Sequence, residues 1–371
     1  MPAAARSASN KGQHMRILVT GTIAGLEDKA WLHRVCEIAA GHGISIDYFD
    51  FVERITAKGE KSMERLLGTT DYIFELIRER EYERIGFEIQ KSGHEHVIVR
   101  APATVEWNRI NRKFKDSKYI RDFIAPDLII TLIDAEWLIK ERLEHVPAAD
   151  MFLQVIKDRN HTIYEILAWM NEEVSLSEDW AKMMGIRHIV MAGGEPPQNL
   201  ISFFVDPSAP MFYASYSMTH SEPEMRKQIT QFVERLREYV VVTDPQKIEI
   251  STGDLGLGVK DKEATYSFTV HRDLHWYVGK CDAVVAIHPY LERPPLSTGM
   301  MDELGHARDY HKGRYMIFPR AISPFVTDSY IEKGHVFDTG EQFFDYLEQH
   351  DHLAPKFRFL YDKEPRKSEL F

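Results

Sequence analysis

Carboxylate and hydroxyl side chains stand beside short apolar segments in the second half of this sequence. Glu303 lies in the stretch STGMMDELGHA, Asp273 lies in HRDLHW, and Tyr213 opens the segment YASYS. Carboxylates act as nucleophiles and as general acids or bases, and a tyrosine hydroxyl can donate a hydrogen bond to one of them. The segments stand at or near expected strand ends, and open α/β sheets bind ligands at the carboxyl ends of their strands. We therefore predict a catalytic site that contains all three residues.

Two glycines, Gly299 and Gly305, flank the carboxylate of Glu303. Glycine allows the backbone to approach a ligand closely, because it has no side chain to stand in the way. A helix that begins near Gly299 would also direct its first N–H groups toward an anion. We expect open space around a reactive carboxylate.

Several hydroxyl side chains accompany these acids. They can donate hydrogen bonds to a phosphate, whereas a carboxylate in the same place would repel it. The residues that we expect to bind a substrate are Ser215, Ser217, Ser297, Thr298, Gly299 and Ser323. Ser297 is equally suited to cap the following helix, and capping would not exclude a phosphate contact.

Three linked segments resemble the nucleoside 2-deoxyribosyltransferase family and, within it, the 2'-deoxynucleoside 5'-phosphate N-hydrolases. They are a helix with Asp-Leu-x-Trp, an apolar strand that begins Asp-Ala-Val-Val, and the pattern Gly-x-x-x-Glu-x-Gly-x-Ala. A strand with Tyr-Ala-Ser precedes them in the expected order. The resemblance covers the second half of the chain only, and the loop that contains Arg293 is longer than the usual connection of the family.

The resemblance implies a role for each matched position. Glu303 matches the nucleophile that attacks the anomeric carbon of deoxyribose, and Asp273 matches the acid that contacts the departing base and helps to protonate it. Tyr213 matches a tyrosine that orients the nucleophile, and Ser297 matches a residue that lines the sugar and its 5' substituent. Ser323 matches a residue that reaches the site of a neighbouring subunit, so a homodimer or higher homo-oligomer is implied.

These residue types suit the cleavage of an N-glycosidic bond. The bond breaks through an oxocarbenium-like state, which a carboxylate on one face of the sugar and an acid near the leaving group would stabilise. Serine at position 297, where transferases for free nucleosides usually carry an acid, favours hydrolysis of a nucleotide. Base exchange between nucleosides, a non-catalytic nucleotide sensor and an NAD-cleaving effector stay open as alternatives.

The elements that must position this site form the second of two predicted domains, at residues 210–371. Its expected strands are 211–214, 239–243, 283–287 and 315–318, with a helix from Pro223 and further helices near 266–279 and 300–311. Gly and Pro residues cluster just before it, which is typical of a boundary.

The first half of the chain also alternates β-branched runs with helical patterns, which is typical of parallel sheets covered by helices. Its expected strands are 16–20, 44–51, 96–100, 128–133 and 188–191, and its expected helices lie near 28–41, 60–92, 135–145 and 162–184. We predict an α/β domain at residues 15–205 after a disordered leader at residues 1–14. The fold class is therefore α/β, with two doubly wound parallel-sheet domains, the second of them Rossmann-like and deoxyribosyltransferase-like.

The first strand leads into a loop that has the position of a phosphate-binding loop but not its sequence. A P-loop needs Gly, Lys and Ser or Thr where this chain has Leu26, Glu27 and Asp28. The order of elements, with Asp134 closing a strand like that of a Walker B motif, resembles the P-loop nucleotide kinases. Because two acids replace the groups that would hold phosphate and magnesium, we predict a degenerate kinase-like domain with a structural or dimer-forming task. Nucleotide sensing is the alternative.

Composition narrows the choice of partners. The 371 residues carry a net charge of −11 without a basic run, so we expect no nucleic acid as a partner, and no apolar segment approaches the ~20 residues of a membrane span. Two distant cysteines suit a reducing cytosol, so we expect a cytoplasmic protein. No HExxH pattern occurs among the histidines at 271, 275, 288, 306 and 311, so neither a metal nor a cofactor is predicted. The expected partner is a small-molecule nucleotide or nucleoside.

Overall fold

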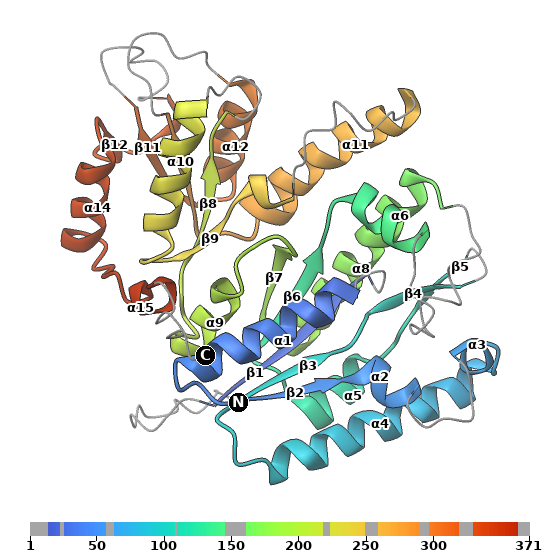
Figure 1. Cartoon of the computed structure of the whole chain (residues 1–371). Coiled ribbons are helices and arrows are strands. Elements are labelled where there is room, and N and C mark those ends of the chain that lie inside the picture. The colour runs from blue at the N-terminus through green and yellow to red at the C-terminus, as the bar shows by residue number, and fades with distance from the viewer. Residues whose placement is uncertain are drawn as a thin grey trace, which may run out of the picture.

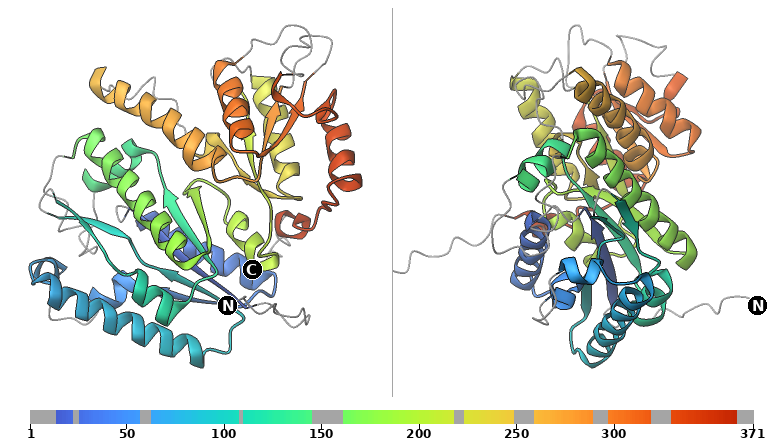
Figure 2. Two further views of the ribbon diagram at one scale, coloured as in Figure 1. Left: turned by 180° about the vertical axis from the view of Figure 1, so that it is seen from behind. Right: turned by 90° about the vertical axis from the view of Figure 1, so that its right-hand side faces the viewer.

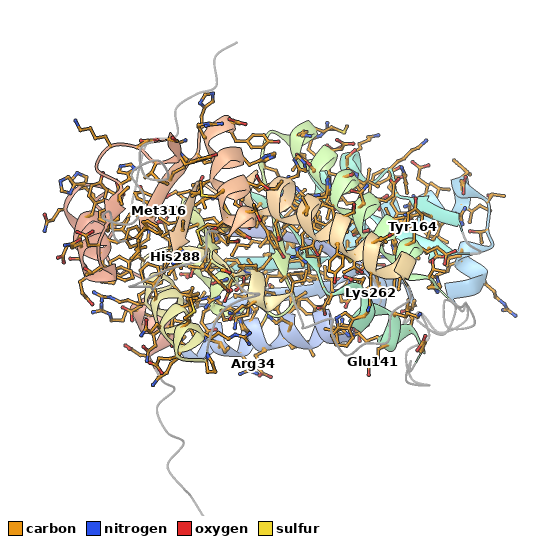
Figure 3. The ribbon with its side chains drawn as sticks, turned by 90° about the horizontal axis from the view of Figure 1, so that it is seen from above. Arg34, Glu141, Tyr164, Lys262, His288 and Met316 are labelled. Atoms are coloured by element: carbon orange, nitrogen blue, oxygen red, sulfur yellow. The ribbon has the colours of Figure 1, made fainter. Side chains whose placement is uncertain are left out.

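The protein contains two α/β units, each built on a parallel sheet of five strands (Figure 1). The computed structural model describes residues 14–22, 26–56, 63–107, 110–144, 161–217, 223–248, 259–288, 297–318 and 329–362. In Figure 3, His288 and Met316 of the second unit lie in one half of the molecule, and Glu141 and Tyr164 of the first lie in the other. The predicted α/β fold class with two parallel sheets is confirmed.

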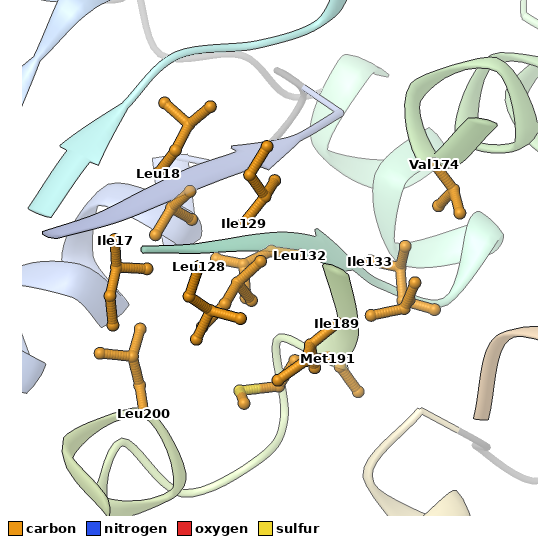
Figure 4. Packing of buried hydrophobic residues seen from close by; sticks show 14 of the residues in the cluster. Ile17, Leu18, Leu128, Ile129, Leu132, Ile133, Val174, Ile189, Met191 and Leu200 are labelled. Carbon is orange, nitrogen blue, oxygen red and sulfur yellow. The ribbon is translucent and has the colours of Figure 1, made fainter. Parts of the chain in front are cut away.

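The first sheet has the strand order β2-β3-β1-β6-β7, and every neighbouring pair is parallel. Its strands are β1 (Met15–Gly21), β2 (Ile46–Asp50), β3 (His96–Arg100), β6 (Leu128–Ile133) and β7 (Arg187–Ala192). Successive side chains of a strand point to opposite faces, and helices cover both faces here, so the central strand β6 is almost wholly apolar and fully buried. Figure 4 shows Leu18 and Ile129 on one face of the sheet and Ile17 and Leu128 on the other.

Helices and one hairpin complete the first unit. The helices are α1 (Leu26–Gly41), α2 (Phe51–Thr56), α3 (Met63–Leu67), α4 (Asp71–Lys91), α5 (Ser117–Tyr119), the π-helix η1 (Ile120–Ile124), α6 (Glu136–Glu144), α8 (Ile163–Met184) and α9 (Gln198–Val205). The antiparallel hairpin of β4 (Thr104–Trp107) and β5 (Ile110–Lys113) was not expected from the sequence.

The single helix expected near 60–92 is wrong, because α3 and α4 are separate helices. A turn at 68–70 separates them, and the side chain of Thr70 accepts a hydrogen bond from the backbone N–H of Ile73 at 3.4 Å. Threonine is a favoured N-cap, since its hydroxyl satisfies an N–H group that has no partner within the helix. A new helix therefore begins at Asp71.

The second sheet has the order β12-β11-β10-β8-β9, again with parallel pairs throughout. Its strands are β8 (Met211–Ser215), β9 (Val241–Thr243), β10 (Ala283–Ile287), β11 (Gly313–Ile317) and β12 (Val336–Phe337). Numbered along the chain, this is the flavodoxin-like order 2-1-3-4-5, which reverses direction between the first and third strands. Ligands bind at such a switch point, which here lies between the carboxyl ends of β8 and β10.

The helices of the second unit are α10 (Pro223–Leu236), the 3-10 helix η2 (Pro245–Lys247), α11 (Val259–His271), the π-helix η4 (Arg272–Val278), α12 (Thr298–Asp309), α14 (Gly340–Gln349) and α15 (Arg358–Tyr361). The helix expected near 266–279 thus begins earlier and changes at Arg272 into a π-helix, where Gly279 N–H reaches the carbonyl of Leu274 at 3.0 Å. π-Helical segments are rare and occur often at functional sites.

Buried polar groups tie the two units together. Glu195, which follows β7, accepts hydrogen bonds from the backbone N–H of Asp244 at 2.6 Å and from Arg237 Nη2 at 2.9 Å. The Asn199 side chain donates to Glu195 at 3.1 Å and to the carbonyl of Val242 at 2.8 Å. Both views in Figure 2 show α11 of the second unit alongside α8 of the first. None of the described helices combines the length and apolar character that crossing a membrane requires.

Replacing Gly194 with alanine is expected to weaken the docking of the two units. A Cβ atom at this position would overlap the backbone carbonyl of Lys247 in the second unit, and neither backbone can yield without moving a domain. We expect a loss of about 1–3 kcal/mol in the free energy of unfolding, measured by denaturant titration. Gly93→Ala is the control, since nothing lies within 4 Å of its added Cβ. Equal stabilities of the two variants would show that the junction is loose.

Candidate functional site

The carboxylate of Glu303 is held at the carboxyl end of β8. Tyr213 and Ser215 are two residues apart on that strand, so their side chains point to the same face of the sheet. The hydroxyl of Tyr213 donates to Glu303 Oε1 at 2.8 Å, and the hydroxyl of Ser215 donates to Oε2. The structure thus brings three of the sequence-predicted residues into direct contact, beside the switch point of the sheet.

The two hydroxyls are buried, whereas Glu303 is only half-buried. Burial is the main cause that raises the pKa of Tyr213 well above its ordinary value, and the charges of Asp273 and Glu303 raise it further. The phenol therefore remains protonated and remains a hydrogen-bond donor over the whole physiological pH range. Both carboxylates therefore lie near enough to this one phenol to act on it electrostatically.

Asp273 lies in η4 and is 9% exposed. Its Oδ1 atom accepts a hydrogen bond from Arg272 Nε at 2.8 Å. Burial raises the pKa of Asp273, while the neighbouring guanidinium of Arg272 acts in the opposite direction. A buried carboxyl with a raised pKa can retain a proton and deliver it, which is what a general acid requires.

Of the remaining predicted residues, three lie at the start of α12. Ser297 caps that helix, because its side chain accepts from the backbone N–H of Met300 at 3.4 Å. Thr298 and Gly299 are exposed in the first turn, and Ser217 is half-buried beyond the end of β8. Ser323 and Arg293 lie outside the described residues.

Packing within the described residues does not require glycine on either side of Glu303. A Cβ atom at Gly299 would have Ser297 Oγ as its nearest neighbour at 3.7 Å, and one at Gly305 would meet Tyr330 Cε1 at 3.8 Å. Both distances are ordinary van der Waals contacts. Among the described residues, the fold would therefore tolerate an alanine at either position.

Three histidine rings of α11, η4 and α12 lie in a row. The ring centroids of His271 and His275 are 4.8 Å apart, and those of His275 and His306 are 4.9 Å apart. Across the described ranges, no three His, Cys, Asp or Glu side chains are arranged to hold a metal ion. Burial lowers the pKa of both His271 and His306, so these two rings are neutral at pH 7.

A buried carboxyl group of the protein itself lies at the carboxyl end of β1. The carboxylate of Glu173, from α8, accepts hydrogen bonds from the backbone N–H groups of Gly21 at 3.0 Å, Ala103 at 2.8 Å and Thr104 at 2.7 Å. The hydroxyl of Thr104 donates to it as well, at 2.6 Å. The backbone N–H group at the carboxyl end of β1 is therefore already bonded within the protein.

Sequence reasoning missed both Glu173 and the contact of Ser215 with Glu303. A signal existed for the first, because Glu173 lies on the apolar face of α8 between Met170 and Val174, and a charged residue on such a face needs partners. Ser215 carried no comparable signal, since its partner is distant in sequence.

Comparison with known proteins does not identify a family. No family model and no curated protein matches the chain. A shikimate kinase from Aquifex aeolicus vf5 is similar over 52% of this chain and 94% of that one, with 11% identity and a TM-score of 0.32. A shikimate kinase from Bacteroides thetaiotaomicron (60% and 98% covered, 11% identity, TM-score 0.31) and a gluconokinase from Sinorhizobium meliloti 1021 (47% and 99% covered, 15% identity, TM-score 0.24) are similar as well. With TM-scores this low, these similarities carry no conclusion about function.

Proposed function

We propose that the protein hydrolyses the N-glycosidic bond of a 2'-deoxynucleoside 5'-phosphate through a covalent intermediate on Glu303. The observation that carries the proposal is the half-buried Glu303 carboxylate, held by Tyr213 and Ser215 at the switch point of the second sheet. The charge of Asp273, which is buried, raises the pKa of the same Tyr213 phenol. The resemblance of these segments to the deoxyribosyltransferase family supports the same reaction.

The reaction proceeds in two displacements at the anomeric carbon. An oxygen of Glu303 forms a bond to C1' while the bond from C1' to the base nitrogen breaks, and its electron pair leaves with the base. Asp273 gives its proton to the departing base. Water then attacks C1', its proton passes to the Asp273 carboxylate, and Glu303 leaves as a carboxylate. The products are the free base and deoxyribose 5-phosphate.

Base exchange on a nucleoside is the second candidate. One of the hydroxyls that would bind a phosphate already has a partner within the protein, because Ser215 donates its proton to Glu303. Fewer donors for a phosphate favour a substrate without one. In that case a second base, instead of water, attacks C1' of the same intermediate.

An assay of base release separates these activities. We expect the protein to release free base, followed by chromatography, from deoxynucleoside 5'-phosphates and not from deoxynucleosides. Release that requires an added second base would establish exchange, and release from NAD would change the substrate class. Tight nucleotide binding without any release would contradict the proposed activity and favour a sensor.

We propose a structural task for the first domain. Its loop donor at Gly21 is bonded to Glu173, and Asp134, at the end of β6, accepts from Arg142 Nη2 at 2.5 Å. Phosphoryl transfer depends on cations and backbone N–H groups that can contact the phosphates. Here the N–H group of Gly21 and the guanidinium of Arg142 are each bonded to a carboxylate of the protein. We also propose a homo-oligomer in which Ser323 reaches the site of a neighbouring subunit. Only the resemblance to the deoxyribosyltransferase family supports this part of the proposal.

A further inference from the structure

Ser215 differs from the other hydroxyls near the site in its burial and its partner. It is the last residue of β8, its side chain is fully buried, and it pairs with Ala286 on the central strand β10. A hydroxyl with no exposed surface is poorly placed to meet a substrate, whereas Thr298 is exposed at the start of α12. The hydroxyl of Ser215 donates its proton to Glu303 Oε2.

We propose that Ser215 is a positioning residue for Glu303 and that it does not contact the substrate. This inference rests on the proposed function, in which Glu303 is the nucleophile. The sequence alone predicted that Ser215 binds the substrate.

The physical reason is that one donor cannot fix a carboxylate. Rotation about the last bond of a glutamate side chain is broad, so a carboxylate held at one oxygen can still turn. Tyr213 holds Oε1, and Ser215 holds Oε2 from a position two residues further along the same strand. Two donors on separate oxygens fix the plane of the carboxylate relative to β8, and a nucleophile that attacks one carbon atom needs such a fixed orientation.

The second hydrogen bond also favours the ionised form of Glu303. Hydrogen bonds to a carboxylate are stronger than those to a neutral acid, so losing one raises the pKa of the group. Tyr213 on β8 donates to Glu303, and Asp273 and Arg272 on η4 are charged groups that act on the same phenol. A change at Ser215 leaves these three groups in place.

The kinetic test is Ser215→Ala with deoxynucleotide and deoxynucleoside substrates. We expect kcat to fall about 10- to 100-fold with little change in KM, because a charge-assisted hydrogen bond is lost while the binding groups remain. The acidic limb of the pH profile of kcat/KM should move up by about one pH unit. Ser215→Cys, which keeps a weak donor, should recover part of the loss. Ser202→Ala is the matched control, because Ser202 is equally buried but donates to the carbonyl of Gln198 at 2.9 Å.

A substrate-binding role for Ser215 would give a different pattern. The KM of the phosphorylated substrate alone would rise, and the pH profile would remain where it is. That result would overturn the inference while leaving the proposed function standing.

Titration of the free enzyme keeps the inference testable without any turnover. Carbon-13 labelled glutamate carboxyls, with the Glu303 signal assigned by its loss in Glu303→Gln, report the pKa of this group directly. A higher pKa in Ser215→Ala than in the wild type supports the positioning role even if no substrate is cleaved. An unchanged pKa contradicts it even if the wild type is active.

Discussion

Glu303→Gln is expected to reduce base release by at least about a thousandfold, because an amide oxygen is too weak a nucleophile to form the glycosyl-enzyme. The substitution keeps the size and shape of the side chain. Both neighbouring hydroxyls can donate or accept, so Ser215 or Tyr213 can turn to meet the new NH2 group. The fold should therefore survive, and the loss of activity would report on chemistry alone.

Asp302→Asn provides the matched control for this prediction. Asp302 is the preceding residue of α12 and is exposed, so the same chemical change there should leave turnover within about twofold. Both variants should unfold at the denaturant concentration of the wild type. If Glu303→Gln kept more than a tenth of the wild-type rate, the covalent mechanism would have to be abandoned.

Local patterns in the sequence were sufficient to predict the strands that frame the site. The apolar runs at β8 and β10 end where expected to within one residue, and parallel strands bring their carboxyl ends to one edge. The proximity of Tyr213 to Glu303 follows from that arrangement. The π-helical turn that carries Asp273 could not be predicted, since no residue type specifies a π-helix.

Contacts between distant segments were beyond prediction from a single sequence. Ser215 and Glu303 are 88 residues apart, and Gly21 and Glu173 are 152 residues apart. Periodicity reports which face of an element is buried but not what lies opposite. The hydrogen bonds of Glu195 with Arg237 and Asp244 at the junction of the units could not be predicted for the same reason. Glu195 precedes the expected boundary near residues 206–209, and its two partners follow it.

The largest loss of stability is expected from Glu173→Ala in the first domain. Truncation would leave three buried backbone N–H groups, at Gly21, Ala103 and Thr104, without their acceptor, and would open a cavity under the sheet. Each unsatisfied donor costs about 1–3 kcal/mol, so we expect a loss of at least ~3–5 kcal/mol in the free energy of unfolding. Denaturant titration measures this loss.

The neighbouring acid on α8 supplies the control. Glu172 is 37% exposed in its side chain and pairs with Lys113 at 2.5 Å on the surface. Glu172→Ala should change stability by less than about 1 kcal/mol, since exposed ion pairs contribute little. Equal effects of the two truncations would mean that water readily replaces the Glu173 carboxylate.

The pH dependence of the free energy of unfolding distinguishes the effect of the Glu173 charge from the effect of its hydrogen bonds. Burial raises the pKa of this carboxyl from its ordinary value to about 7, so between pH 4.5 and 7 the folded protein binds a proton that the unfolded chain has released. Stability must then fall as pH rises through that window. Glu173→Gln removes this contribution, while Glu195, whose pKa burial also raises to about 7, keeps its own. From pH 4.5 to 7 the wild type should therefore lose stability relative to Glu173→Gln. A difference in unfolding free energy that does not depend on pH would show that Glu173 stays ionised throughout.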